Sequence, residues 1–144
     1  MSRIKLSLPE KSIFACKHTI SITEINYGNH LSNDAILGII HNARVLFLNS
    51  IDCSEKSLEG ETGIIMADTG IVYKNEGFHN DKLNIEIFVD QPGKINFDIY
   101  YRLTRTSDNK IVAEAKTGIV CFNYNTRKVA EVPKSFVSKV GWQK

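Results

Sequence analysis

The 144-residue sequence has few of the residues that mark disulfide scaffolds and metal centres. Its three cysteines, Cys16, Cys53 and Cys121, lie far apart without CxxC spacing, and its four histidines show no HExxH or similar metal-ligand spacing. This pattern argues against a disulfide framework and against a zinc site, and it fits a reducing, cytoplasmic compartment. We therefore expect no metal and no cofactor.

Long apolar runs and charge of one sign are also lacking. No segment approaches the roughly 20 apolar residues that a membrane-spanning helix needs, and the N-terminus carries no apolar run typical of a signal peptide. With 18 basic and 16 acidic residues the net charge is +2, and no basic cluster indicates nucleic-acid binding. The sequence therefore predicts neither a membrane partner nor a nucleic-acid partner.

The chain does contain enough apolar residues for a packed core. Hydrophobic residues make up 42% and charged residues 24%, close to the averages of soluble globular proteins. No repeat, low-complexity segment or linker divides the sequence, so we expect one domain over residues 1–144.

Residues 32–51 show the spacing of an α-helix. Ser32 or Asn33 can serve as the N-cap, and Asp34 places a negative charge in the first turn, where it suits the helix dipole. Gly38, in the middle, indicates the close approach of another segment. Apolar residues cover most of the circumference, which predicts a buried helix: Ile36, Leu37, Ile39, Ile40, Ala43, Val45, Leu46, Phe47, Leu48 and Ile51.

Strands are predicted on both sides of this helix. Residues 64–73 are nearly all apolar, as expected of a central strand, and turn-forming residues occur at 90–93 and 106–109. Clean alternation elsewhere predicts an antiparallel sheet with one buried face, hence an α+β fold with a short C-terminal tail. The five predicted strands are residues 18–25, 64–73, 83–89, 95–103 and 111–122.

Residues 20–48, ISITEINYGNHLSNDAILGIIHNARVLFL, resemble the hotdog-fold acyl-CoA thioesterases, the group that includes hydroxybenzoyl-CoA thioesterase. Members typically have a strand, a G-H-V-N-N-like turn and a long helix carrying E-A-R; the corresponding stretches here are residues 28–33 and 41–44. The resemblance implies a long central helix wrapped by a curved antiparallel five-stranded sheet. It also implies an acyl-CoA substrate and a homodimer or homotetramer whose active sites take groups from both chains.

The resemblance places the substrate carbonyl at the N-terminus of the helix. Unpaired N–H groups and the positive dipole end lie there, and they stabilise the negative charge that develops on a thioester oxygen during hydrolysis. The backbone N–H of Asn33 or a neighbour is our oxyanion-hole candidate, and a helix cap is compatible with that role. Gly28, Asp34 and Lys74 are predicted substrate-binding positions, Lys74 for the CoA phosphates; a first-turn charge and a solubilising lysine are the alternatives for the last two.

Asn26 stands where several relatives carry a catalytic aspartate. An amide cannot act as a carboxylate nucleophile or general base, but it can orient a water molecule. Asn26 is therefore either a water-orienting group or only a turn residue. His30 matches the histidine of the family's turn, where it either transfers a proton or holds the turn by hydrogen bonds.

Two residues further along are candidates for the general base. His41 falls where many relatives carry a glutamate, and a neutral imidazole is a competent base at physiological pH; the alternative is a structural histidine in the dimer contact. Asp68 interrupts an apolar run, and a carboxylate buried there needs a partner. That partner is either a catalytic water or Arg44, and we favour the structural pair with Arg44.

Three functions fit these residues. The first is an acyl-CoA thioesterase in which water, oriented by Asn26, attacks a carbonyl held at the helix N-terminus. The second is a hotdog dehydratase that acts on acyl-carrier-protein substrates and uses His30 or His41 with Asp68. The third is a non-catalytic acyl-CoA binding protein, since the aspartate is missing. We predict the first, a thioester hydrolase.

Overall fold

The computed structural model describes residues 1–90 and 93–142, so the turn expected at 90–93 lies partly outside the described residues. The elements, in chain order, are β1 (Phe14–Thr19), the 3₁₀ helix η1 (Ile22–Glu24), α1 (Asn33–Ser50), β2 (Thr62–Tyr73), β3 (Lys82–Val89), β4 (Asn96–Arg105), β5 (Ile111–Asn123), β6 (Lys128–Val129) and α2 (Lys134–Lys139).

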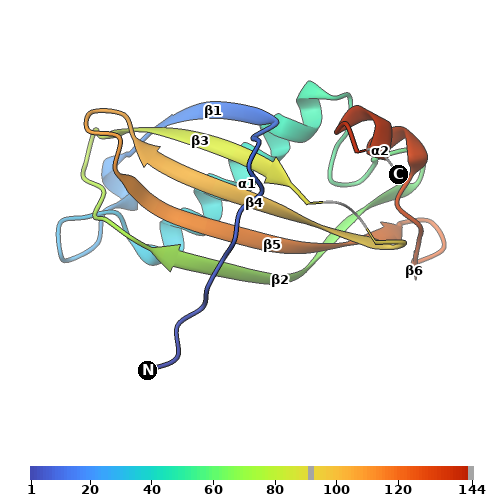
Figure 1. The fold of residues 1–144 in the computed structure, drawn as a ribbon, viewed down its shortest axis with the longest axis horizontal. Coiled ribbons are helices and arrows are strands. Elements are labelled where there is room, and N and C mark those ends of the chain that lie inside the picture. Colours follow the sequence, from blue (N-terminus) through green and yellow to red (C-terminus); the bar gives the residue numbers. More distant parts are fainter. Residues whose placement is uncertain (91–92, 143–144) are drawn as a thin grey trace.

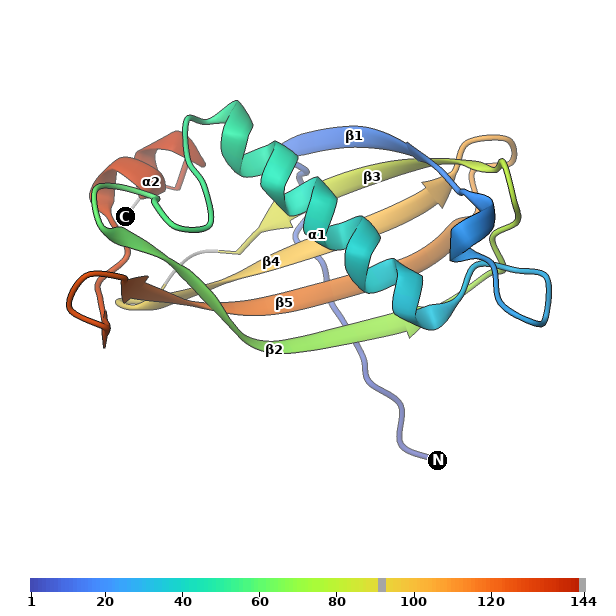
Figure 2. The same cartoon turned by 180° about the vertical axis from the view of Figure 1, so that it is seen from behind.

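A single long helix, α1, crosses one face of a curved antiparallel sheet (Figures 1 and 2). The strand order is β1-β3-β4-β5-β2, with the short β6 paired to β5. Each of these pairings is antiparallel. The α+β hotdog fold predicted from the sequence is confirmed.

The core lies between α1 and the inner face of the sheet. In β4 the buried Phe97, Ile99, Tyr101 and Leu103 alternate with more exposed residues, as the period of a strand requires. The helix is buried on one side only, because Leu37 remains 49% exposed and Leu46 41% exposed. The predicted burial of the helix is therefore found on one side only in the single chain. The buried side consists of Ile36, Ile39, Ile40, Ala43, Arg44, Phe47 and Leu48.

Strand β2 lies at an edge of the sheet, not at its centre as its apolar sequence predicted. It pairs only with β5, and a bulge between Met66 and Asp68 shifts the register. Residues 65–69 are exposed in the single chain. An apolar strand at an open edge is a surface that proteins normally pair or cover.

Both ends of the chain differ from the prediction. Strand β1 ends at Thr19, because Ser21 and Glu24 form a capping box and start the short helix η1. Ile22 is consequently 64% exposed and takes no part in a strand. The predicted C-terminal tail contains α2 instead, and its Phe136 is buried against the rings of Phe97 and Trp142.

Residues 1–12 cross the outer face of the sheet, on the side away from α1 (Figure 1). A Cβ at Gly70 would lie 3.7 Å from Ile4 and 4.0 Å from Leu6, so the chain's own N-terminal segment covers this glycine. A Cβ at Gly38 would meet nothing within 4 Å, so none of the described residues makes the close approach predicted there. Among the described residues, no helix is long and apolar enough to span a bilayer.

Candidate active site at the N-terminus of α1

A cavity of about 330 Å³ opens at the N-terminal end of α1. It brings together four of the predicted site residues: Asn26 and His30 from the turn before α1, Asn33 from its first turn, and Lys74 from the end of β2. The remaining lining residues are Leu31, Ile36, Tyr73, Asn75, Glu76, Gly77 and Val112. The other four predicted residues, Gly28, Asp34, His41 and Asp68, are not among its lining residues.

The first turn of α1 keeps one backbone donor free. Ser32 is the N-cap, and its Oγ accepts a hydrogen bond of 3.3 Å from the N–H of Ala35. The N–H of Asp34 donates to Asn33 Oδ1 at 3.0 Å. The N–H of Asn33 donates to no acceptor in the described part of the chain. A free N–H at the positive end of a helix is suited to an oxygen that gains negative charge.

The amide of Asn26 organises the turn with its oxygen. Oδ1 accepts hydrogen bonds from the N–H of Gly28 at 2.9 Å and from the N–H of His30 at 3.4 Å. The backbone N–H of Asn26 in turn donates to the carbonyl oxygen of His30 at 3.0 Å. Because Oδ1 is engaged, the group of Asn26 left to contact a ligand is Nδ2, which can only donate.

His30 is half-buried beside this amide. Its Nδ1 lies 3.4 Å from the carbonyl oxygen of Leu31, which can accept a hydrogen bond from it. A Cβ added to Gly28 would come within 2.9 Å of His30 Nε2 and 3.3 Å of Asn26 Oδ1. Gly28 therefore leaves the imidazole and the amide room to lie side by side.

The loop between β2 and β3 forms the opposite wall, and sequence reasoning missed it. The N–H of Leu31 donates to the carbonyl oxygen of Gly77 at 2.7 Å, which joins this loop to the turn before α1. A Cβ at Gly77 would lie 2.8 Å from Ile20 Cδ1 and 3.3 Å from Leu31 Cβ. The glycine in the loop was the available signal, since a close backbone approach requires it.

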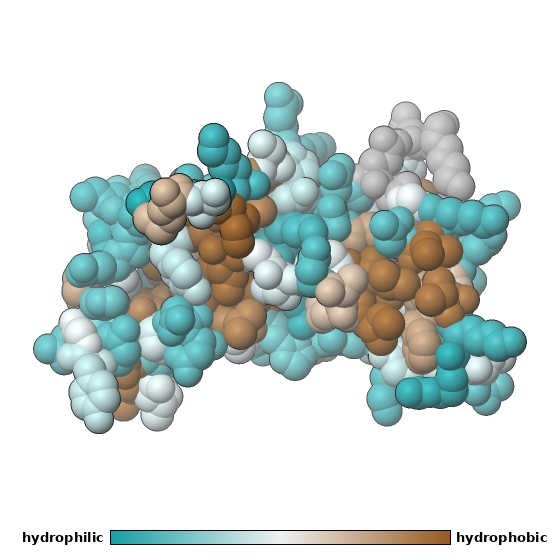
Figure 3. Space-filling model, turned by 90° about the horizontal axis from the view of Figure 1, so that it is seen from below, coloured by the Kyte–Doolittle hydropathy of each residue, from teal (hydrophilic) through white to brown (hydrophobic). Residues whose placement is uncertain are grey.

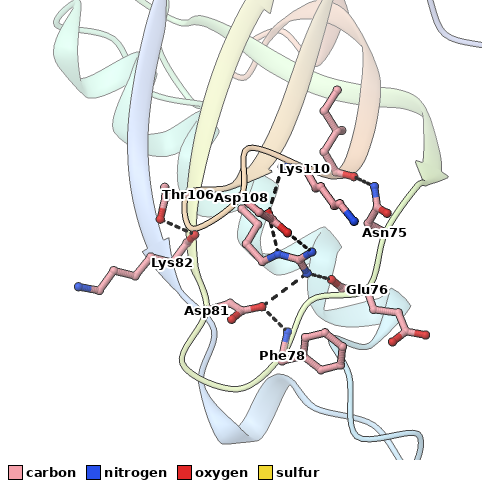
Figure 4. A network of polar contacts seen from close by, with 10 residues as sticks. Asn75, Glu76, Phe78, Asp81, Lys82, Thr106, Asp108 and Lys110 are labelled. Carbon is pink, nitrogen blue, oxygen red and sulfur yellow. Dashed lines mark hydrogen bonds and ion pairs between the residues drawn. The ribbon is translucent and has the colours of Figure 1, made fainter.

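Arg105, the last residue of β4, also binds the loop between β2 and β3 (Figure 4). Its guanidinium donates to both carboxylate oxygens of Asp108, at 3.0 and 2.8 Å, and to the carbonyl oxygen of Glu76. Asp81 Oδ2 lies 3.8 Å from the guanidinium and accepts from the N–H of Phe78 at 2.9 Å. The hydrogen bond from Arg105 lowers the pKa of Asp108 to about 2.

Lys74 and Asp34 lie at the margin of the site. Lys74 lines the cavity, but its Nζ pairs with Glu114 at 3.2 Å and is partly exposed. Asp34 is exposed in the first turn, and a side-chain hydrogen bond from Ser32 lowers the pKa of its carboxyl. Asp34 is not among the residues that line the cavity.

His41 lies further along α1 and is paired. Its Nε2 lies 2.8 Å from Glu55 Oε1, and the imidazole is 59% exposed. Glu55 Oε2 lies 3.7 Å from Nε of Arg44, which is buried and donates from Nη1 to the hydroxyl of Tyr101 at 3.1 Å. The Tyr101 hydroxyl also bonds Thr117 at 2.8 Å. In one chain His41 thus belongs to a polar network beside the core, away from the cavity.

Asp68 is not the buried carboxylate that its apolar neighbours predicted. Its side chain is 64% exposed on the outer face at the β2 bulge. It accepts from Lys116 Nζ at 2.8 Å and from the N–H of Gly118 at 3.1 Å, and the lysine hydrogen bond lowers its pKa. The favoured pair of Asp68 with Arg44 was therefore wrong.

Comparison with solved structures identifies several proteins of the same fold. A 1,4-dihydroxy-2-naphthoyl-CoA thioesterase from Synechocystis is 18% identical with a TM-score of 0.79, over 88% of this chain and 94% of its own. A Staphylococcus aureus protein solved in complex with CoA is 16% identical with a TM-score of 0.80, over 94% of this chain and 85% of its own. A DHNA-CoA thioesterase from Staphylococcus aureus is 14% identical with a TM-score of 0.74, over 86% of this chain and 83% of its own.

The comparison with curated proteins gives no match. A family model, in contrast, matches residues 20–140, which include the turn before α1, the helix and all of β2 to β5. That model describes the thioesterase-like superfamily. The chain is therefore a member of the thioesterase-like superfamily.

Proposed function

We propose that the protein hydrolyses acyl-CoA thioesters in the cavity at the N-terminus of α1. The observation that carries this proposal is the N–H of Asn33, which has no acceptor among the described residues. Asn33 is the first residue of α1 and lines a cavity together with Asn26 and His30. Membership of the thioesterase-like superfamily and structural relatives that act on or bind CoA compounds support the same reaction. Water and acyl-CoA would give the free acid and CoA.

Two donors in the cavity can hold the carbonyl oxygen. The N–H of Asn33 adds the helix dipole to its hydrogen bond, and Asn26 contributes Nδ2, because its oxygen is already engaged with Gly28 and His30. Both groups are fixed by the turn before the reaction begins. Preorganised donors of this kind stabilise the developing oxyanion without reorganisation during the reaction.

The remaining surface of the cavity suits an acyl chain and its carrier. Leu31, Ile36 and Val112 supply apolar side chains to its lining, and Tyr73 adds an aromatic ring. Lys74 and its neighbours line the same opening, so Lys74 stays our candidate for a CoA phosphate. The acyl group would enter toward the apolar residues while the CoA moiety stays outside.

A second copy of the chain would complete this site from the β2 side. The exposed side chains of β2 include Ile65, Met66 and Tyr73, which are 39%, 37% and 56% exposed, and Tyr73 also lines the cavity. Figure 3 views the molecule from that side and shows hydrophobic side chains gathered in two areas. We propose a homodimer joined along β2, with a homotetramer as the larger alternative. Light scattering at micromolar concentration tests it: an active species at the 16.2 kDa chain mass would contradict the dimer.

The dehydratase alternative receives no support from the geometry of one chain. It needs Asp68 beside His30 or His41, but Asp68 is bound to Lys116 on the outer face, and His41 is bound to Glu55.

Thiol release tests the proposed function. Purified protein is incubated with a panel of short-, medium- and long-chain and aromatic acyl-CoAs, and free CoA is followed with a colorimetric thiol reagent. We expect turnover of at least one of them. Binding of acyl-CoA without turnover of any member would replace the hydrolase with the acyl-CoA binding protein considered above.

A further inference from the structure

The proposed hydrolysis requires a base that neither Asn26 nor the paired His41 supplies, and the cavity lining leaves His30 and Glu76 as the candidates. An amide does not accept a proton at neutral pH, and the imidazole of His41 lies outside the cavity. Among the residues that line the cavity, Glu76 is the one carboxylate. We propose that Glu76 is the general base that activates the attacking water in this site, a role that rests on the proposed thioester hydrolysis.

Hydrogen bonds hold the backbone on both sides of Glu76 in the sequence. The side chain of Asn75 donates to the carbonyl oxygen of Ile111 at 2.7 Å, and the N–H groups of Lys74 and Asn75 donate to that of Val112 at 2.9 and 3.2 Å. Beyond Glu76, the bond from Leu31 to Gly77 and the guanidinium of Arg105 fix the chain again. A base must be positioned before it can act, and these bonds position the backbone of Glu76.

The carboxylate of Glu76 is free to accept a proton. Within the described chain it makes no hydrogen bond or ion pair, and Figure 4 shows its side chain extending away from the contacts drawn there. The nearby cations are engaged elsewhere: Lys74 with Glu114, and Arg105 with Asp108. Glu76 differs in this from Glu55, which is paired with His41.

The reaction with Glu76 as base conserves atoms and charge. Glu76 takes a proton from water as the water oxygen bonds to the acyl carbon, and the carbonyl oxygen becomes an oxyanion held by the N–H of Asn33. Collapse of this intermediate re-forms the C=O bond and breaks the C–S bond. The CoA sulfur leaves as a thiolate and takes the proton from Glu76, so that the acid and CoA thiol are formed and the carboxylate returns.

A matched pair of glutamate variants tests the proposal. Glu76→Gln keeps the size of the side chain but removes the base, so we expect kcat to fall by about 10²–10⁴-fold while KM changes by less than about threefold. Glu59→Gln is the control, because Glu59 is an exposed glutamate in the loop before β2 and lies outside the cavity. Thermal melting should show both variants as stable as the wild type. A kcat for Glu76→Gln equal to that of Glu59→Gln would overturn the role.

A second variant separates a lost base from a disturbed loop. Glu76→Asp keeps a carboxylate at the same position of the loop. We expect its kcat to stay at least about tenfold above that of Glu76→Gln. A Glu76→Asp variant as slow as Glu76→Gln, with unchanged thermal stability, would count against a missing base. If the wild type releases no CoA from any substrate, the proposed function itself fails. If the wild type is active and Glu76→Gln retains full activity, hydrolysis stands and the role of Glu76 falls.

Discussion

Polar groups beside the two halves of α1 are in opposite states. At its N-terminus, Asn33, Asn26 and Glu76 line one cavity, and the N–H of Asn33, the Nδ2 of Asn26 and the carboxylate of Glu76 have no hydrogen-bond partner among the described residues. Half-way along, His41 is bound to Glu55, which lies near the buried Arg44. The difference teaches that free polar groups beside a cavity, more than residue type, distinguish the proposed active site from the rest of the helix surface.

The outer face of the sheet extends the comparison. Asp68 was a candidate for catalysis because of its sequence context, yet it is satisfied by Lys116 and by the N–H of Gly118. A carboxylate with two donors has little basicity left to offer, and its lowered pKa reflects this. The predictions below test whether the free groups act and whether the paired groups only stabilise.

After Glu76→Gln, the largest effect is expected at Asn26. Replacing it with alanine removes one of the two proposed oxyanion donors, so we expect kcat to fall by about 10²–10³-fold. Asn42→Ala, on the exposed side of α1, is the control and should keep wild-type turnover. Steady-state thiol release measures both. Full activity in Asn26→Ala would show that the amide serves the turn alone.

The second prediction compares how alanine at Gly77 and at Gly38 changes the free energy of unfolding. Gly77→Ala places a Cβ 3.3 Å from that of Leu31 and 2.8 Å from Ile20 Cδ1, so we expect a loss of about 1–3 kcal/mol in the free energy of unfolding. Gly38→Ala, in a helix and with nothing within 4 Å, should instead raise that free energy by about 0.5–1 kcal/mol. Urea denaturation measures both. A destabilised Gly38→Ala would indicate that a second chain packs on this part of α1.

A smaller effect concerns pH and the loop that carries Glu76. The pKa of Asp108 is lowered to about 2 from 3.8, so its contribution to stability is fully present above about pH 4 and disappears as the pH falls through 2. Asp108→Asn should therefore be less stable than the wild type at pH 6, and the two should converge toward pH 2. Denaturation midpoints measured between pH 6 and 2 provide the test. A constant difference over that range would contradict the ion pair with Arg105.

The smallest effect is expected at His41. Because its imidazole is paired with Glu55 and lies outside the cavity, His41→Ala should change kcat by less than about threefold. Thiol release on the substrate used for Asn26→Ala gives the direct comparison. A fall of about 100-fold would restore the general-base role predicted from the sequence, with His41 acting in the cavity of a second chain.

The sequence predicted the elements that depend on neighbouring residues, namely the start of α1 and the strands with alternating apolar residues. The helix begins after Ser32, whose side chain caps Ala35, as the residue types indicated. Strands β3 to β5 follow from alternation, because one face of each packs on α1. The apolar run of β2 was misleading, since a strand buried in a core and a strand at an open apolar edge have the same composition.

The candidate site could be predicted as far as it lies in one continuous segment. Asn26, Gly28, His30 and Asn33 occur within eight residues, and three of them, Asn26, His30 and Asn33, line one cavity; their catalytic roles stay predictions. The wall formed by Glu76 and Gly77 could not be found in the same way, because it reaches the turn through the β2–β3 connection. Partners set by tertiary structure, such as Lys116 for Asp68, are likewise invisible in a linear pattern.

A structure with a bound, non-hydrolysable acyl-CoA analogue, in which a methylene group replaces the thioester sulfur, tests the account most directly. We predict that its carbonyl oxygen lies about 2.7–3.1 Å from the N–H of Asn33, with the Nδ2 of Asn26 as the second donor. The acyl group should contact Leu31 and Ile36. A carbonyl bound instead beside His41 and Glu55, or beside Asp68 and Lys116, would contradict the assignment of the active site to the N-terminus of α1.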